Sequence, residues 1–419
     1  MRVLIINTSE RIGGAAIAAT RLMKALKKKG VKARMLVRDK QTDHLTVVTA
    51  GSCWKHSLHF VWERLCIFIA NGFCLKKLFL VDIANAGTDV TSCPDFKRAD
   101  VIHLHWVNQG FLSMDDIGKI LHSGKPVVIT MHDQWYFTGV CHYSNECCKY
   151  QSQCQRCPQL RAGLLGDYAR RLFNKKKLMY ENAPVTFVGC SRWMANLAKT
   201  SVLTRGHKVV NVPNAIDSTI FMPMDKTEAR EQFGLPCDKR LLLFGCQRIT
   251  DERKGFQYMA DALSIIKKKG EAGNIVLVVV GGKADTVAGL VPVDTIPVSY
   301  VSDPRKLVQL YNAVDVYVTP SLQDNLPNTI MEALACGTPC VGFDVGGIPE
   351  MIDHKRNGYV ARYKDAADFA DGILWTLDND AEGMLGKDAR EKVLREYSED
   401  AVADKYIQLY ENKYSHGDI

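Results

Sequence analysis

One pattern occurs in both halves of this 419-residue chain: a short apolar run, a loop with glycine, a helix closed by glycine, and a second apolar run. The first copy begins at Val3–Ile6, passes Gly13 and Gly14, and continues as a helical stretch over about Ala16–Lys29. An apolar run of this length is too short for a helix and is typical of a strand that is buried on both faces. This order of elements predicts a doubly wound parallel α/β sheet.

The second copy begins near residue 240. Arg240–Phe244 predicts a strand, Gln257–Lys269 a helix, and Ile275–Val280 the next strand. The two helices end alike, because Leu22–Gly30 and Leu263–Gly270 both finish in three lysines and a glycine. Cations in the last turn complement the helix dipole, and the glycine ends the helix. The chain is therefore expected to form two Rossmann-like domains.

A linker at Val212–Asp217 places the boundary between these domains. Residues 1–210 form the expected N-terminal domain and residues 211–395 the C-terminal domain, each long enough to bury its own core. A last helical pattern within 396–419 could cross back to the first domain. Further strands are expected at the other short apolar runs, namely Val31–Val37, Val101–His105, Pro126–Thr130, Thr186–Gly189, Val314–Thr319 and Pro339–Phe343.

The composition restricts the class of protein. Charged residues make up 24% and hydrophobic residues 47%, which excludes wholesale disorder and a polytopic membrane protein. The net charge of +8 is mild for this size, so no nucleic-acid partner is expected. Because Met1–Asn7 lacks the apolar core of a signal peptide, we expect a cytoplasmic protein with reduced thiols.

The segment Trp54–Leu80 is the one strongly apolar region of the chain. Glu63 and Arg64 interrupt it, and the uninterrupted part is too short to span a bilayer. A helix in the protein core is the preferred interpretation. The alternative is a surface-seeking helix, which would suit a lipid-linked substrate and peripheral contact with the inner face of a membrane.

The most informative segment is Pro320–Pro339. An expected strand ends in a loop that contains Asp324, and a short helix begins near Asn328, a good N-cap, with Glu332 one turn into it. Loops at the carboxyl ends of strands line the ligand crevice of such sheets, and a helix N-terminus there favours a diphosphate. Because carboxylates disfavour phosphates, the two acids are expected to bind sugar hydroxyls.

Cations for the phosphates follow the expected strand Arg240–Phe244. Arg248 offers a bidentate guanidinium group, and Lys254 offers a point charge beside Gly255, where the backbone can approach a ligand. Taken alone, these residues are a weak signal, because Arg and Lys in a loop are usually just solvated.

In their order and spacing, the motifs of this chain resemble those of family 4 of the nucleotide-sugar-dependent glycosyltransferases, which are retaining enzymes of the GT-B fold. The resemblance runs nearly from end to end. The matching segments are Gly13-Gly14, Thr130–Asp133, Gly189–Ser191, Val212–Asp217, Arg248 to Gly255, Val279–Gly282, Asp315 to Ser321, and the Asp324 and Glu332 pair followed by Ala333–Pro339. The resemblance implies two Rossmann-like domains that face each other across a cleft.

The resemblance also implies a nucleotide-sugar donor and the residues that would hold it. Arg248 and Lys254 would bind the diphosphate and stabilise the leaving group, and Glu332 would bind the ribose hydroxyls. The β-phosphate oxygen, rather than a side chain, would take the proton of the acceptor. No catalytic metal is expected, because the cationic side chains and the helix dipoles would stabilise the charge of the diphosphate in its place.

Three further contacts follow from the same resemblance. Asp324, with the backbone amides of Asn325 and Leu326, would bind the transferred sugar. The pair Gly13-Gly14 would let the N-terminal loop approach the donor phosphate. The family usually has Glu at the first acidic position, so the sugar contact of the shorter Asp324 could differ.

Histidines follow two of the expected strands. The resemblance places His132 beside the transferred sugar, although a strand-end histidine bonded to a neighbour is common. His103 and His105 alternate on one strand and therefore share a face. For these two residues, lining a cleft and a purely structural role are both open.

A loop after His132 is rich in cysteine. Cys141, Cys147, Cys154 and Cys157 give the spacing C-x5-C-x6-C-x2-C, which suits a structural zinc in a segment that can bury little. Reduced cysteines without a metal are the alternative, and the expected compartment disfavours a disulfide. A similar loop occurs in relatives that build bacterial surface polysaccharides. We expect it to shape the acceptor side and to do no chemistry.

Three functions remain open on the sequence. The favoured one is a hexosyltransferase that moves a sugar to a glycan or lipid-linked acceptor in polysaccharide biosynthesis. The alternatives are a nucleotide-sugar epimerase on the same fold and a non-catalytic protein that binds a nucleotide sugar or glycan. The acidic pair with Arg248 and Lys254 favours transfer over epimerisation.

Overall fold

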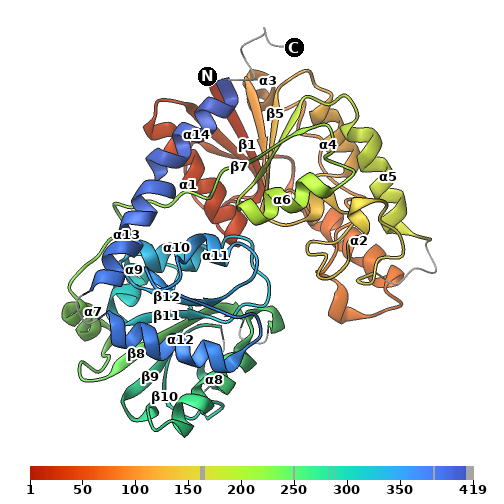
Figure 1. Ribbon diagram of the computed structural model, residues 1–419. Helices are drawn as coiled ribbons and strands as arrows, with labels where there is room; N and C mark the ends of the chain where they lie inside the picture. Colours follow the sequence, from red (N-terminus) through yellow and green to blue (C-terminus); the bar gives the residue numbers. More distant parts are fainter. Residues whose placement is uncertain (161–165, 249–250, 283, 288, 381–382, 412–419) are drawn as a thin grey trace. The chain divides into compact units, whose positions relative to one another are not determined.

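The computed structural model describes residues 1–160, 166–248, 251–282, 284–287, 289–380 and 383–411, without the side chains of residues 76 and 246–248. The chain divides into two compact units. The first unit comprises Met1–Pro213 together with the C-terminal residues from Val402, and the second comprises Asn214–Ala401. Each unit contains one parallel sheet flanked by helices (Figure 1).

The sheet of the first unit has the strand order β3-β2-β1-β4-β5-β6-β7, and every neighbouring pair is parallel. Strands β4, β5 and β6 are buried along their whole length, which explains their continuous apolar runs. The strands are Arg2–Ser9 (β1), Lys32–Asp39 (β2), Val47–Thr49 (β3), Val101–Leu104 (β4), Val127–Met131 (β5), Val185–Gly189 (β6) and Lys208–Asn211 (β7).

Helices of the first unit connect these strands and cover the sheet. Gly13, at φ 92°, lies just before α1, and the lysines at the end of α1 precede Gly30 at φ 82°. The α-helices are Gly14–Lys28 (α1), Cys53–Ala70 (α2), Pro94–Arg98 (α3), Met114–Leu121 (α4), Tyr168–Tyr180 (α5) and Arg192–Thr200 (α6). Short 3-10 helices are Leu75–Lys77 (η1), Trp135–Phe137 (η2) and Lys149–Gln151 (η3).

The last helix, α14 (Glu399–Glu411), begins in the second unit and continues in the first. Its tyrosines are buried in the first unit. Tyr406 shares a hydrogen bond of 2.8 Å with the hydroxyl of Thr130, and the Tyr410 hydroxyl lies 2.7 Å from Nδ1 of His103. Polar contacts as well as apolar packing therefore hold α14 against β4 and β5.

The sheet of the second unit has the order β10-β9-β8-β11-β12-β13, again entirely parallel. Numbered from its own first strand, this order is 3-2-1-4-5-6, the arrangement of a Rossmann fold. The strands are Arg240–Arg248 (β8), Ile275–Gly282 (β9), Asp294–Val298 (β10), Val316–Thr319 (β11), Cys340–Phe343 (β12) and Gly358–Ala361 (β13).

The helices of the second unit complete the alternation of strand and helix. Its α-helices are Lys226–Phe233 (α7), Phe256–Lys268 (α8), Pro304–Ala313 (α9), Asn328–Ala335 (α10), Ile348–Met351 (α11), Ala366–Asn379 (α12) and Met384–Glu396 (α13). Its 3-10 helices are Glu252–Lys254 (η4), Ala272–Asn274 (η5) and Ala284–Val287 (η6). The two Rossmann-like domains expected from the repeated pattern are confirmed.

Helix α2 contradicts the preferred interpretation of Trp54–Leu80 as a core helix. Only Cys66, Ile67 and Ala70 of the helix join the core, and the polar residues His56, Glu63 and Arg64 are buried beside them. Its large apolar residues on the opposite side are exposed to solvent. The expectation was wrong because apolar content shows that a helix has an apolar face but not which side of it faces the protein. Within the described parts of the chain, every helix is too short or too polar to cross a bilayer.

Candidate functional site

The switch point of the second sheet lies between β8 and β11, where the strand order reverses. Ligands of open α/β sheets bind at such a point, outside the carboxyl ends of the strands. Lys254 follows β8 and Asp324 follows β11, and the Nζ atom of Lys254 lies 2.7 Å from Oδ2 of Asp324. Burial alone would lower the pKa of Lys254, but the Asp324 carboxylate outweighs it and raises this pKa above its usual value.

The loops at this switch point lie so close together that two of their positions have no room for a side chain. Gly255 has φ 67°, and a Cβ atom there would lie 1.9 Å from the carbonyl oxygen of Pro320. Gly346 has φ 62°, and its Cβ would lie 1.8 Å from the carbonyl oxygen of Asp324. Glycine is therefore required at both positions, on the two sides of the loop that carries Asp324.

Glu332 lies on α10 and is buried. The hydroxyl of Tyr311, on α9, donates a hydrogen bond of 2.9 Å to its Oε2. Burial and this carboxylate raise the pKa of Tyr311, so the phenol stays protonated as a donor. The helix begins at Asn328 as expected, but Asn328 is its first residue, and Pro327 occupies the N-cap without a side-chain hydrogen bond. The expectation that Asn328 caps the helix is thus corrected by one residue.

The other predicted donor residues lie around the same switch point. Asn325 and Leu326 are buried in the loop between Asp324 and α10. Arg248 is the last residue of β8 and pairs with Gly282 of β9, while its side chain lies outside the described part of the chain. The structure thus brings Lys254 and Asp324 into contact and places Arg248 at the carboxyl end of a strand beside them.

The first sheet has its switch point between β1 and β4. The loop after β1 carries Gly13 and Gly14, which lead into α1. Its course is fixed by Glu10, whose Oε2 accepts hydrogen bonds from the backbone amides of Gln41 (2.9 Å) and Thr42 (3.0 Å). The predicted glycine pair therefore lies at the edge of the sheet where ligands bind in this architecture.

Three histidines lie together at the carboxyl ends of β4 and β5. The rings of His103 and His105 are 4.3 Å apart, and Nδ1 of His105 lies 2.9 Å from Nε2 of His132. Burial lowers the pKa of His132 to about 4 and that of His103 to about 3. The His105 pKa is also lowered, with burial as the main cause. At neutral pH these rings are uncharged and can exchange hydrogen bonds without adding positive charge to the site.

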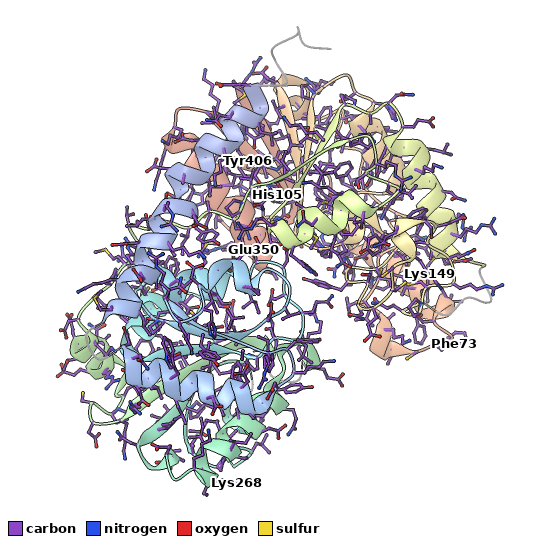
Figure 2. All side chains as sticks on the ribbon, in the orientation of Figure 1. Phe73, His105, Lys149, Lys268, Glu350 and Tyr406 are labelled. Atoms are coloured by element: carbon purple, nitrogen blue, oxygen red, sulfur yellow. The ribbon has the colours of Figure 1, made fainter. Side chains whose placement is uncertain are left out.

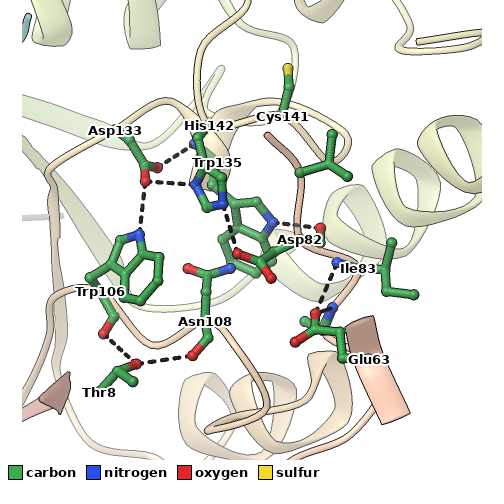
Figure 3. Close-up of polar contacts among 12 residues, drawn as sticks. Thr8, Glu63, Asp82, Ile83, Trp106, Asn108, Asp133, Trp135, Cys141 and His142 are labelled. Atoms are coloured by element: carbon green, nitrogen blue, oxygen red, sulfur yellow. Dashed lines mark hydrogen bonds and ion pairs between the residues drawn. The ribbon is translucent and has the colours of Figure 1, made fainter. Parts of the chain in front are cut away.

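A polar network surrounds Asp133, the residue after His132 (Figure 3). Its Oδ2 accepts hydrogen bonds from Nε1 of Trp106 at 2.8 Å and from Nδ1 of His142 at 2.7 Å. The Nε2 atom of His142 lies 2.7 Å from Oδ2 of Asp82. Burial would raise the pKa of Asp133, but His142 and its other donors lower it below the usual value. His142 thus joins the cysteine-rich loop to the strand end that carries His132.

Two buried groups near this network have unused hydrogen-bonding capacity. Both side-chain polar atoms of Asn108 and the Nε2 atom of His105 are buried without a hydrogen-bond partner among the described residues. In Figure 3 the amide of Asn108 lies between Trp106 and Asp82. A buried polar atom without a partner costs about 1–3 kcal/mol, so these atoms are candidates for contacting a polar ligand. Sequence reasoning missed Asn108, although its position just after a predicted strand end was a usable signal.

The four predicted metal ligands surround one small cavity. Cys141, Cys147, Cys154 and Cys157 all line a space of about 20 Å³, which has room for a single atom of the size of a water molecule. The thiol of Cys141 interacts with that of Cys157 and lowers the pKa of Cys157 to about 7. Among the described residues, no three His, Cys, Asp or Glu side chains have the arrangement of a bound metal.

A lysine ammonium lies beside these thiols. Lys176 of α5 is fully buried, and its Nζ donates hydrogen bonds to the carbonyl oxygens of Trp135 and Thr138. The ammonium also lies 3.6 Å from the centre of the Trp135 ring. Burial lowers its pKa to about 7, while Cys154 and Cys141 act in the opposite direction. The buried cation therefore lies where negative charge on the sulfurs would stabilise it.

Comparisons with known proteins find two family models that match this chain. The family described as Glycosyl transferases group 1 matches residues 238–379, and the family described as Glycosyltransferase Family 4 matches residues 12–219. The N-acetyl-alpha-D-glucosaminyl L-malate synthase of Bacillus anthracis is 27% identical over 218 residues, which cover 51% of this chain and 56% of that protein.

A second relative is the N,N'-diacetylbacillosaminyl-diphospho-undecaprenol alpha-1,3-N-acetylgalactosaminyltransferase of Campylobacter jejuni. It is 28% identical over 191 residues, which cover 44% of this chain and 49% of that protein. The chain thus spans about half the length of these two curated relatives.

Solved structures share the whole fold. The sucrose-phosphate synthase of Thermosynechococcus elongatus superposes with a TM-score of 0.68 at 20% identity, covering 100% of both chains. The Anabaena protein Alr3699/HepE, in complex with UDP and glucose, gives a TM-score of 0.64 at 14% identity, covering 98% of this chain and 100% of that one. At these identities the likeness establishes the fold.

Proposed function

The chain belongs to the family 4 glycosyltransferases of the GT-B fold, and from that premise we propose that it is a retaining hexosyltransferase. It would move a hexose-type sugar from a nucleotide-sugar donor to a glycan or lipid-linked acceptor in polysaccharide biosynthesis. We place it in the cytoplasm, with peripheral contact to the inner face of the membrane.

The contact between Lys254 and Asp324 carries this proposal. A cation and a carboxylate 2.7 Å apart at the switch point of a Rossmann-like sheet suit the diphosphate and the sugar of a nucleotide sugar. The ammonium matches the diphosphate, and the carboxylate matches the hydroxyls of the sugar. When the glycosidic bond to the phosphate breaks, negative charge grows on the leaving diphosphate, and Lys254 would stabilise that charge. Arg248, at the end of β8, which is the strand before Lys254 in the chain, would assist.

The first unit supports an acceptor site. The unpartnered atoms of Asn108 and His105 lie at the carboxyl ends of its strands, where a saccharide hydroxyl could satisfy them. His132 is uncharged at neutral pH because burial lowers its pKa, so it would contact a sugar as a hydrogen-bonding group. We assign acceptance of the acceptor's proton to the β-phosphate of the donor. None of these histidines then has to take up a proton during the reaction.

The alternatives make different predictions for one experiment. An epimerase changes the sugar of the donor and releases no nucleoside diphosphate, and a binding protein does neither. We would first measure the thermal midpoint with UDP-, GDP- and ADP-sugars, because a bound ligand stabilises the folded form. With the stabilising donor, we would then measure release of nucleoside diphosphate and transfer to an acceptor.

The decisive variant is Lys254→Ala. We expect it to lower diphosphate release by about a hundredfold or more, the usual effect of removing one charge-stabilising donor. The matched control is Lys268→Ala, because Lys268 is an exposed lysine at the far end of α8. Sugar conversion without diphosphate release would establish the epimerase, and stabilisation by donor with no turnover would establish the binding protein.

We also propose a structural zinc ion in the cysteine-rich loop. The four thiols line one atom-sized cavity and supply the number and kind of ligands of a closed zinc site, and a bound ion would draw them into a tetrahedral arrangement that they do not have in this structure. Zinc bound by four thiolates carries two negative charges, and the ammonium of Lys176 would offset part of that charge. The metal would fold the loop and orient His142 toward Asp133, with no part in the chemistry.

A further inference from the structure

Helix α2 buries Cys66, Ile67 and Ala70 in the core of the first unit, and it also exposes a row of large apolar residues to solvent. Its buried side includes His56, Glu63 and Arg64. Its exposed large apolar residues recur at helical spacing on one side, namely Trp54, Leu58, Val61, Trp62 and Leu65. Trp54 is 79% exposed and Leu58 is 67% exposed. A surface helix in water normally turns such residues inward, so a partner is expected to cover this side.

Polar contacts keep the helix in this orientation. Oε1 of Glu63 accepts hydrogen bonds from the backbone amides of Ile83 (3.0 Å) and Ala84 (2.6 Å). The guanidinium group of Arg64 forms an ion pair with Asp82. Rotating α2 to bury its apolar side would break these contacts and leave buried charges unpaired, which is strongly unfavourable. These buried polar contacts therefore keep the apolar side of α2 exposed to solvent.

The residues that follow α2 also expose large apolar side chains. Four more large apolar side chains are exposed there, namely Phe73, Leu75, Phe79 and Leu80. Of the twenty exposed large hydrophobic residues in the described chain, nine lie within Trp54–Leu80. We call these nine residues the α2 surface. Figure 2 shows Phe73 at the outer end of this segment.

The charge of the segment indicates what covers this surface. Residues 53–80 contain four cationic residues, Lys55, Arg64, Lys76 and Lys77, and one acidic residue, so their net charge is 4 − 1 = +3. Glu63 and Arg64 are both buried and offset each other, which leaves the charges of the three lysines. Exposed tryptophan and phenylalanine beside lysine, with no exposed carboxylate, are what an interfacial helix presents to anionic lipid.

We propose that the α2 surface docks this protein onto an anionic lipid bilayer, with Trp54, Leu58 and Trp62 inserted at the level of the headgroups. The helix lies in the plane of the interface and does not cross it. A second copy of the chain fits this surface less well. In a symmetric dimer the surface would face itself, and the cations of the two copies would repel.

The docked helix is connected to the candidate acceptor side. Arg64 pairs with Asp82, Asp82 with His142, and His142 with Asp133, which precedes the loop of buried aromatics at η2. Through this chain of contacts, the lipid surface and the strand end that carries His132 are held in one unit. Resting on the proposed transferase function, this arrangement favours a lipid-linked saccharide over a soluble glycan as the acceptor.

The test is sedimentation of the full chain with vesicles of phosphatidylcholine alone and of phosphatidylcholine mixed with phosphatidylglycerol. We expect binding to the mixed vesicles, with quenching of tryptophan emission by brominated lipid. The double variant Leu58→Ser with Trp62→Ser should lose at least tenfold in vesicle partition. Lys55→Gln should lose about fivefold and weaken the salt dependence of binding.

The matched control is Leu45→Ser with Leu394→Ser, because these exposed leucines lie outside the α2 surface. The control should bind vesicles like the unmodified chain, and thermal midpoints should show that every variant folds. Absence of binding to mixed vesicles would overturn the proposal, as would equal binding of the double variant. A dimer in solution that Leu58→Ser with Trp62→Ser dissociates, without vesicle binding, would assign the surface to self-association instead. Vesicle binding needs no donor, so its failure leaves the transferase proposal intact.

Discussion

Lys254 and Asp324 form an ion pair of 2.7 Å between the loops that follow β8 and β11. The two residues are 70 positions apart in the sequence, and the parallel pairing of β8 with β11 brings their loops together. Because the carboxylate raises the pKa of the lysine, it favours the charged form of this half-buried ammonium. The charge of Lys254 therefore depends in part on Asp324.

The first prediction concerns Asp324→Asn. Losing the carboxylate lowers the pKa of Lys254, so the ammonium loses its proton at a lower pH. We expect kcat/KM at pH 7 to fall roughly tenfold to a hundredfold, the effect of one lost charge-assisted hydrogen bond. The basic limb of the pH profile should move to lower pH. Asp324→Glu keeps the carboxylate and should leave that limb in place. An Asn variant with an unmoved basic limb would contradict the coupling.

The second prediction concerns stability in mild acid. Burial lowers the pKa of His103 to about 3 and of His132 to about 4, below an unfolded value of about 6.5. As the pH falls below about 6.5, the unfolded chain therefore binds protons that the folded chain does not. Each histidine should lower the free energy of unfolding by roughly 2 kcal/mol between pH 7 and pH 5.

Urea unfolding at the two pH values measures this effect. His103→Gln removes one of these histidines. It should therefore reduce the difference in unfolding free energy between pH 7 and pH 5 by about 2 kcal/mol. His122→Gln is the control, since His122 is exposed at the end of α4 and should leave the difference unchanged. Equal stability of the unmodified chain at both pH values would show that the buried rings do not govern its acid sensitivity.

The sequence predicted the central strands of both sheets but missed all four strands at the sheet edges, which are β3, β7, β10 and β13. Inner strands such as β4 and β12 are buried on both faces, so their apolar runs are continuous and easily found. The edge strands β7 and β10 are half exposed, and their residues carry no such run. Local composition therefore reveals a strand only where both of its faces are covered.

Some residues of the candidate site could likewise be predicted from the sequence, and others could not. Lys254 and Asp324 were predictable because each lies in the connection after a strand, and strand ends of a parallel sheet share one edge. The contact of Tyr311 with Glu332 was not predictable, because it depends on how α9 packs beside α10. The orientation of α2 was also hidden, since Glu63 finds its partners at the backbone of residues 83 and 84, about 20 positions away.

The third prediction concerns the C-terminal helix. The hydroxyl of Tyr410 lies 2.7 Å from Nδ1 of His103, and both residues are buried. Tyr410→Phe removes the hydroxyl and leaves a buried ring nitrogen without its partner. We expect a loss of about 1–3 kcal/mol in the free energy of unfolding, measured with urea. Tyr300→Phe, at an exposed tyrosine, should leave stability unchanged. Unchanged stability in Tyr410→Phe would mean that the Tyr410 hydroxyl does not help to hold α14 in place.

The fourth prediction concerns zinc in the cysteine-rich loop. Protein purified under reducing conditions should contain about one zinc ion per chain, measured by elemental analysis. Cys157→Ser removes one of the four thiols around the cavity, so zinc content should fall and the thermal midpoint should drop by about 5–10 °C. Cys237→Ser changes an exposed cysteine of the second unit and should alter neither quantity.

The same variant separates zinc from a purely packed loop. If the thiols only fill space, Cys157→Ser is nearly isosteric, and a chelator should not change the thermal midpoint of the unmodified chain. If zinc folds the loop, the chelator should lower that midpoint to the value of Cys157→Ser and should have no further effect on the variant. Because Lys176 is fully buried beside Cys154 and Cys141, removing the metal should also leave its ammonium without a counter-charge. Lys176→Met should therefore stabilise the metal-free protein while weakening its affinity for zinc, and the opposite result would refute a charged thiolate site.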